Sequence, residues 1–235
     1  MAKNKKNNIK KTSCDFITLD DLLDSLCDSC EKNGMTFEDI VNLDAAANDR
    51  ELIITDVVEN LGVSVASIIN FWNRKDERDG IEISKRIPIK ILIDSNGGSL
   101  TDAFTIINAI ELSKTPVQTI VTGKAYSAGF FIAIAGHQRF AYPYASFLYH
   151  EGSAANGGTA SQFRNFAEFY EKQLDLLKNH VLKYTTIDEE QYIKIKKDDV
   201  WMLATDALKI HAIDAIVPPL HNGKQPEEDS DWEIK

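Results

Sequence analysis

The chain has 235 residues, 43% of them hydrophobic, which is enough to bury the core of one large domain and leave a smaller appendage. A formal net charge of −10 argues against a nucleic-acid binder, whose affinity depends on clustered lysine and arginine. The longest apolar runs are too short to cross a bilayer, and no apolar segment follows the basic start, so we expect neither a membrane span nor a secretory signal.

The three cysteines, Cys14, Cys27 and Cys30, give information about the cellular compartment rather than about a metal or redox site. Cys27 and Cys30 have the spacing of a redox or zinc pair, but they lie in a helical pattern, and the nearest histidine, His137, is far along the chain. We interpret the spacing as coincidence and expect no metal and no cofactor. An odd number of cysteines without a signal peptide is typical of the reducing cytoplasm, where we expect the protein to act.

The composition changes twice along the chain and predicts three parts. Residues 1–48 form an extension, with a Lys- and Asn-rich start expected to be disordered and two short helices opened by Thr-x-x-Asp capping boxes. Residues 49–217 form the body, and the acidic residues 218–235 form a tail that we expect to be disordered.

The body alternates between strand and helix patterns, which predicts an α/β fold with parallel strands. Strands are predicted at residues 52–54, 87–93, 117–121, 139–142, 146–150 and 213–217, and helices at residues 63–72, 100–112, 130–135, 161–184 and 205–209. Residues 74–79 are interpreted as a charged turn. The strand at 87–93 is apolar at nearly every position, as in strands that are covered on both faces. In the longest helix we expect a buried side formed by Phe163, Phe166, Phe169, Leu174, Leu177 and Val181.

A lone serine, Ser127, stands at a turn of small residues between a predicted strand and a buried helix. The N–H of the next residue, Ala128, lies at the helix N-terminus, where the dipole favours an anion. Nucleophilic serines use this geometry, while the alternative is a serine that only caps the helix. A nucleophile also needs a base and an acid, for which His150 and Asp199 are candidates; Asp198 is a second carboxylate beside Asp199.

Gly97 and Gly98 follow another predicted strand and precede a helix. A glycine pair at such a turn lets the backbone approach a ligand closely and point N–H groups outward. The segment lacks the Lys-Ser/Thr of a P-loop and the G-x-G-x-x-G pattern, so a plain tight turn is the alternative.

Four motifs occur in a fixed order: residues 93–99 (Ile-Asp-Ser-Asn-Gly-Gly-Ser), 123–129 (Gly-Lys-Ala-Tyr-Ser-Ala-Gly), 143–150 (Pro-Tyr-Ala-Ser-Phe-Leu-Tyr-His) and 199–204 (Asp-Val-Trp-Met-Leu-Ala). Together they make residues 50–217 similar to the ClpP-like serine peptidases, the proteolytic subunit of the Clp protease. The resemblance implies a crotonase-like α/β fold of repeated β-β-α units with a protruding handle helix, here with a small N-terminal helical appendage.

The resemblance also implies a site and an assembly. It assigns Ser127, His150 and Asp199 to a catalytic triad, the backbone N–H groups of Gly97 and Ala128 to an oxyanion hole, and Gly98, Gly157 and Gly158 to binding of extended peptide. The implied reaction is hydrolysis of peptide bonds in unfolded proteins or peptides through an acyl-enzyme. Members of the family form stacked heptameric rings that are fed by an ATP-driven unfoldase. For this chain the resemblance implies a homo-oligomeric ring, either a heptamer or a double heptamer, and a Clp-type ATPase as a candidate partner.

The chain also departs from the family pattern. Near the site, Asn96 replaces a proline, and Glu151 and Gly152 replace the Gln-Pro that follows the histidine in the family. Asp198 stands where the family commonly has an arginine that pairs between rings, and His211 replaces a helix-ending glycine. Lys90 and Leu92 replace tyrosines that help form the unfoldase docking pocket. These departures favour one alternative, a non-catalytic ring subunit or scaffold. A signal-peptide-peptidase-like enzyme with a lysine base shares the fold and the serine turn and is a second alternative. An acyl-CoA enzyme of the crotonase type is a weaker one, because it does not need the Ser-His pair.

Overall fold

The computed structural model describes residue 42 and residues 45–219. The chain divides into two compact units, residues 1–49 and residues 50–235. The described part of the first unit includes the short π-helix η1 (Ala45–Asp49). The predicted helices of the extension and the predicted disorder at both ends lie outside the described residues.

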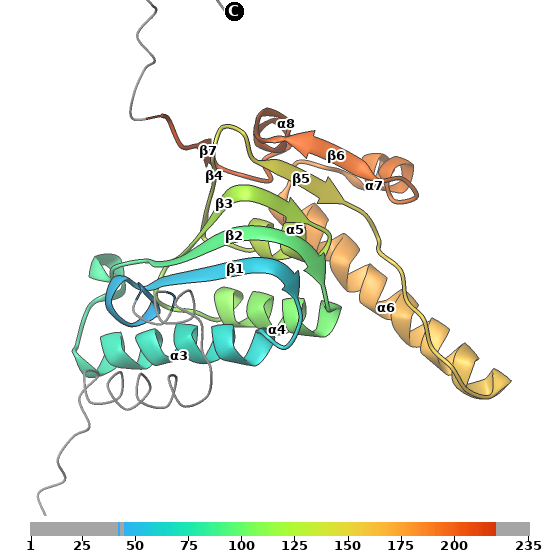
Figure 1. Cartoon of the computed structure of the whole chain (residues 1–235), viewed down its shortest axis with the longest axis horizontal. Coiled ribbons are helices and arrows are strands. Elements are labelled where there is room, and N and C mark those ends of the chain that lie inside the picture. The colour runs from blue at the N-terminus through green and yellow to red at the C-terminus, as the bar shows by residue number, and fades with distance from the viewer. Residues whose placement is uncertain (1–41, 43–44, 220–235) are drawn as a thin grey trace, which may run out of the picture. The chain divides into compact units, whose positions relative to one another are not determined.

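The second unit is built on a seven-stranded sheet, and Figure 1 shows its strands with helices packed beneath them. The strands are β1 (Glu51–Val58), β2 (Ile89–Gly98), β3 (Val117–Tyr126), β4 (Gln138–Ala141), β5 (Ser146–Tyr149), β6 (Val200–Leu203) and β7 (Ala215–Ile216). The main path is β1-β2-β3-β4-β7, while β5 pairs with β3 and β6. All pairs are parallel except β5 with β6. The prediction of an α/β fold with parallel strands is therefore confirmed.

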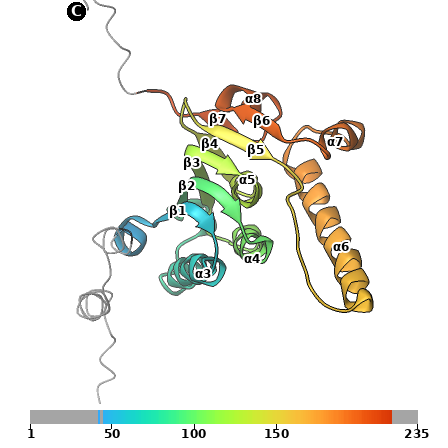
Figure 2. The same ribbon diagram turned by 45° about the vertical axis from the view of Figure 1, so that its right-hand side comes forward.

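The helices of this unit are α3 (Gly62–Arg78), α4 (Leu100–Glu111), α5 (Ala128–Ile134), α6 (Ala160–Tyr184), α7 (Glu189–Ile195) and α8 (Ala204–Lys209), with the 3₁₀ turn η2 (Ile83–Lys85). Helices α3 and α4 pack against each other on one side of the sheet (Figures 1 and 2). All seven residues of α5 are buried, and this helix contacts β2, β3 and α4. The core therefore surrounds α5, the helix that follows Ser127.

The strand β2 is covered on one face more fully than on the other. Ile89, Ile91 and Ile93 are fully buried, whereas Lys90 and Leu92 are only half-buried. The Lys90 ammonium pairs with the Glu51 carboxylate of β1 at 2.6 Å. The expectation of a strand buried on both faces is therefore wrong for the face that carries Lys90, because the side chains of this ion pair are 41% and 29% exposed to solvent.

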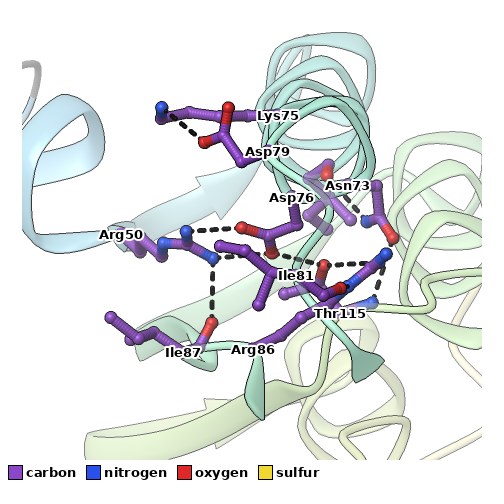
Figure 3. A network of polar contacts seen from close by, with 10 residues as sticks. Arg50, Asn73, Lys75, Asp76, Asp79, Ile81, Arg86, Ile87 and Thr115 are labelled. Carbon is purple, nitrogen blue, oxygen red and sulfur yellow. Dashed lines mark hydrogen bonds and ion pairs between the residues drawn. The ribbon is translucent and has the colours of Figure 1, made fainter. Parts of the chain in front are cut away.

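The predicted charged turn at residues 74–79 is wrong, because α3 continues through Arg78. Its charged residues are compatible with a helix since most of them face solvent, but Asp76 faces inward. Figure 3 shows the Arg50 guanidinium bound to both carboxylate oxygens of Asp76, at 2.9 and 2.7 Å. The Thr115 hydroxyl donates to the same carboxylate at 2.8 Å. The charged sequence at residues 74–79 gave no sign that Asp76 pairs with Arg50, which lies far away in the sequence.

Of the six residues predicted to form the buried side of the long helix, two are exposed and two are only partly buried. The side chains of Phe163 and Phe169 are 55% and 56% exposed, while Leu177 and Val181 are buried. In both views α6 leaves the body, and its first turns lie beside the extended segment that precedes it (Figures 1 and 2). The helical periodicity is correct, but only the C-terminal end of α6 has a core to pack against.

The sequence reading missed α7 and β6. Asp188 and Gln191 form a capping box at the start of α7, a signal that was present in the sequence. The strand β6 has four residues, and its partner β5 is remote in sequence. Such a strand is defined by its pairing rather than by a local pattern.

Candidate active site

Ser127 directly follows β3, which extends through Tyr126 rather than ending before the glycine turn. The strands β3 and β5 are parallel and pair Tyr126 with Leu148. The Ser127 N–H donates to the Leu148 carbonyl at 2.9 Å. The serine therefore lies at the carboxyl end of β5, where His150 emerges.

The backbone of Ser127 has φ 53° and ψ −120°, a conformation that residues with a side chain rarely adopt. Its hydroxyl makes no capping bond to α5. Ser99, by contrast, caps α4 by accepting a hydrogen bond from the Asp102 N–H at 3.2 Å. The alternative that Ser127 is only a helix cap is therefore wrong. A strained strand-to-helix turn that presents a serine is the geometry of a nucleophile elbow.

His150 and Asp199 are brought together by the antiparallel pair of β5 and β6. Tyr149 pairs with Val200, so His150 and Asp199 occupy the next opposed position. His150 Nδ1 lies 3.8 Å from Asp199 Oδ1, which is an ion-pair distance but longer than a hydrogen bond. The two side chains are 33% and 61% exposed. Among the hydrogen bonds of residues 45–219, none joins the Ser127 hydroxyl to the His150 ring.

The neighbouring acid, Asp198, lies just after the end of α7. Its backbone N–H donates to the Ile195 carbonyl at 3.1 Å. Of the two acids, Asp199 is the one whose carboxylate contacts the histidine at ion-pair distance in the described part of the chain.

Gly97 packs against the serine turn. It lies near the end of β2 and has φ 94°, a value that favours glycine. A Cβ atom added to it would lie 2.6 Å from the Tyr126 carbonyl oxygen, 2.7 Å from Ser127 Cβ and 3.0 Å from the Ala128 nitrogen. The interpretation of Gly97 as part of a plain turn is incomplete, because β2 runs through it and brings it against the serine.

The two expected oxyanion donors differ in their surroundings. Ala128 is the first residue of α5, so its N–H has no acceptor inside the helix. The N–H of Gly97 donates to the Ser95 hydroxyl at 3.1 Å. Ser95 is fully buried, and the sequence analysis did not single it out. Its place on the inward-facing side of β2, two residues after Ile93, was the available signal.

The three glycines assigned to peptide binding lie on two different segments. Gly98 is exposed at the end of β2. Gly157 and Gly158 are exposed in the segment before α6, which has no strand pairing in the described structure. The Tyr170 hydroxyl of α6 donates to the Glu151 carbonyl at 3.1 Å, which ties the start of this segment to the helix.

His211 stands where the family has a helix-ending glycine. Its φ is 59°, so the backbone there is left-handed, the conformation that glycine adopts most easily.

Within residues 45–219, no cluster of three or more histidine, cysteine or acidic side chains is arranged to hold a metal ion. In the same part of the chain, no helix combines the length and apolar character that a bilayer span requires.

The fold and the residues at its strand ends define an α/β protein of the ClpP-like class, with the residue types of a hydrolase at one edge of the sheet. The chain belongs to the Clp protease family, whose family model matches residues 81–219. It is similar to the ATP-dependent Clp protease proteolytic subunits of Leuconostoc citreum (29% identity, 74% of this chain and 84% of the relative) and Streptococcus mutans (31%, 72% and 85%). A third relative is subunit 2 of Treponema denticola (26%, 79% and 90%).

Proposed function

We propose that the chain is a serine endopeptidase that hydrolyses peptide bonds of unfolded proteins or peptides. Ser127 is the nucleophile, His150 the general base, and Asp199 the acid that orients the imidazole and stabilises its charged form. The N–H groups of Ala128 and Gly97 stabilise the oxyanion. The observation that supports the proposal is the strand pairing around a strained serine: Ser127 follows Tyr126, which pairs with Leu148 two residues before His150, and the pairing of β5 with β6 places His150 opposite Asp199.

The reaction has two stages. The Ser127 hydroxyl oxygen attacks the peptide carbonyl carbon while its proton passes to the His150 ring. The ring then protonates the leaving amine, the C–N bond breaks, and an ester on Ser127 remains. Water attacks this ester by the same route, which releases the acid and restores the hydroxyl. Small shifts of His150 toward Ser127 and Asp199 accompany substrate binding, because catalytic hydrogen bonds often tighten only in the complex.

The extended peptide lies between two segments of backbone. Gly98 supplies one edge at the end of β2, and Gly157 and Gly158 supply the other. All three are exposed and have no side chain to obstruct a strand of substrate. Pairing of an extended peptide with free backbone groups is a common recognition mode.

A fluorophosphonate probe tests the nucleophile, because it reacts covalently with activated serines. We expect labelling of the wild-type protein at Ser127 and none in Ser127→Ala. The matched control is Ser153→Ala, in the exposed segment after β5, which keeps full labelling. His150→Ala tests whether the general base is His150 or a lysine. Loss of labelling in this variant supports the triad, whereas retained labelling supports the lysine-base alternative.

A second candidate is a non-catalytic ring subunit, and two observations favour it. The distance of 3.8 Å between His150 and Asp199 exceeds a hydrogen bond, and the Gly97 N–H is directed at Ser95. A folded protein that neither reacts with the probe nor cleaves unfolded protein would establish this function in place of the peptidase.

The ring assembly is also a proposal. Its support is the exposed apolar side chains of α6, among them Phe163 and Phe169 on its projecting part and Leu176 nearer the body. Exposed apolar patches of this kind are characteristic of surfaces that pack on another protein. A native mass spectrum tests it: seven or fourteen copies are expected, as in the family, and a monomer would contradict the assembly.

A Clp-type ATPase is the proposed source of unfolded substrate, since the relatives are subunits of ATP-dependent proteases. The ion pair of Lys90 with Glu51 lies on the strand that carries the docking tyrosines in the resemblance. A partner ATPase would therefore have to match a charged surface there. ATP-dependent degradation of an unfolded protein by the reconstituted pair tests this partnership.

A further inference from the structure

The strand β6, which begins directly after Asp199, has few attachments to the sheet. It has four residues and, among the described strands, pairs only with β5. The pair nearest the acid is Tyr149 with Val200, so Asp199 lies one residue beyond the strand ladder. At the other end of β6, the Ala204 N–H donates to the Ala145 carbonyl at 3.0 Å. Strand pairing alone therefore does not fix the position of the acid.

One side chain of β6 reaches past β5 to the strand that leads to the serine. Leu148 of β5 pairs with Tyr126 of β3 on one side and with Trp201 of β6 on the other, so the three residues form a row across the sheet. The rings of Tyr126 and Trp201 meet edge to face, with centroids 5.2 Å apart and planes at 80°. This contact joins two strands that do not pair with each other, since β5 lies between them (Figure 1).

The Trp201 ring lies on the face of β6 that carries the acid. Successive side chains of a strand point to opposite faces. Met202 is buried, whereas Trp201 and Leu203 on either side of it are each 61% exposed. Asp199 is two residues from Trp201 and therefore shares its face. On β5, Leu148 is likewise two residues from His150, so the aromatic contact borders both the acid and the base.

The Tyr126 ring gives Trp201 a well-fixed partner. Its hydroxyl lies 2.8 Å from the Ser146 hydroxyl of β5, a hydrogen-bond distance. Tyr126 is the last residue of β3, a strand of ten residues that pairs with β2, β4 and β5. Ser127 follows it directly. Trp201 thus packs on the strand that presents the nucleophile.

We propose that Trp201 is a positioning residue for the triad acid. By packing on Tyr126, its ring holds β6 at a fixed place relative to β3, and this sets the position of Asp199 beside His150. Edge-to-face aromatic pairs stabilise a structure beyond the area they bury, which suits a strand with a single neighbour. The inference rests on the proposed function, in which Asp199 orients the imidazole. Contact of the exposed ring with the substrate is the competing explanation.

Hydrogen exchange of the full-length protein tests whether Trp201 holds the strand. Trp201→Ala removes the ring, and the β6 amides are expected to exchange about two- to tenfold faster, the range that one aromatic pair implies. Trp201→Phe keeps a ring and is expected to restore most of the protection. The matched control is Leu203→Ala, because Leu203 has the same exposure on the same face of β6 but is not part of the aromatic pair. Unchanged exchange in Trp201→Ala would overturn the proposal.

The rate of labelling by a fluorophosphonate tests whether Trp201 acts through the acid. Trp201→Ala is expected to lower this rate about 10- to 10²-fold, as a displacement of about 1 Å implies, and Leu203→Ala to leave it unchanged. When Asp199→Asn is already present, Trp201→Ala is expected to have no further effect, because the group that it positions is gone. An equal loss with and without Asp199→Asn would overturn the positioning role and support substrate contact. A wild type that is not labelled would overturn the proposed function, and the exchange of β6 would still decide whether Trp201 holds the strand.

Discussion

The Cα of Gly97 lies so close to the Ser127 turn that a Cβ atom on it would be 2.7 Å from Ser127 Cβ. Real Cβ contacts do not occur at this distance, and the other nearby atoms belong to the backbone of Tyr126 and Ala128. The glycine is therefore part of the serine turn, although thirty positions separate the two residues in sequence.

Gly97→Ala is predicted to displace the serine turn and one oxyanion donor. We expect probe labelling and peptide turnover to fall by about 10²- to 10³-fold, the usual cost of one oxyanion donor. The matched control is Gly80→Ala, because Gly80 also has a positive φ of 67° but no atom within 4 Å of an added Cβ. The control is expected to lose about 1 kcal/mol of stability from backbone strain and no activity. Equal activity of both variants would contradict this role for Gly97.

The two adjacent acids are predicted to differ in effect. Asp199→Asn leaves the His150 ring without its anionic partner and favours the wrong tautomer, so the acylation rate is expected to fall by about 10⁴-fold. Asp198→Asn removes an exposed charge and is expected to change the rate by less than about fivefold. Stopped-flow acylation with an activated ester measures both rates; the reverse order would assign the triad acid to Asp198.

The buried ion pair of Arg50 and Asp76 is predicted to matter for stability. Burial raises the pKa of the Asp76 carboxyl, but hydrogen bonds from Arg50 and Thr115 outweigh burial and lower it. Asp76→Asn leaves the Arg50 guanidinium buried without its counter-charge, and we expect a loss of about 3–5 kcal/mol in the free energy of unfolding. The exposed pair of Lys75 and Asp79, also visible in Figure 3, provides the control Asp79→Asn, expected to cost about 0.5 kcal/mol or less.

The same pair gives an acid dependence with a definite sign. A carboxyl whose pKa is lowered by folding contributes stability above its unfolded value, near pH 4, and loses it as the pH falls toward the folded value. In urea titrations between pH 5 and pH 2, the wild type is therefore expected to lose more stability than Asp76→Asn. Parallel curves would show that Asp76 is not the group responsible.

His180 is predicted to link the stability of α6 to pH. Burial lowers the pKa of its ring, although the contact of its Nε2 with the Phe131 carbonyl at 2.9 Å and the nearby Glu111 oppose the shift. Below about pH 6.5 the unfolded chain binds a proton that the folded chain resists, so stability falls as the pH drops, by at most about 1.4 kcal/mol per unit. Denaturant titrations at pH 7.5 and 5.5 are expected to show a smaller loss for His180→Gln.

Local signals in the sequence predicted much of the fold. The alternation of strand and helix, the helix from Leu100 and the small-residue turn at Ser127 depend on periodicity, caps and neighbouring residues, which are all encoded within a short stretch. The order of the four motifs was sufficient to indicate the family, to which the family model assigns residues 81–219. The strand and helix pattern and the order of the motifs do not depend on which residues pack against these segments in the folded protein.

Burial and pairing were decided by tertiary structure. Phe163 and Leu177 follow the same helical pattern, yet Phe163 is exposed and Leu177 is buried because the body meets only one end of α6. Asp76 belongs to a charged run, and Arg50, from another segment, turns it inward. Asp199 is opposed to His150 because β6 adds to β5 in one register. In each case the deciding energy comes from a partner remote in sequence, which no local pattern contains.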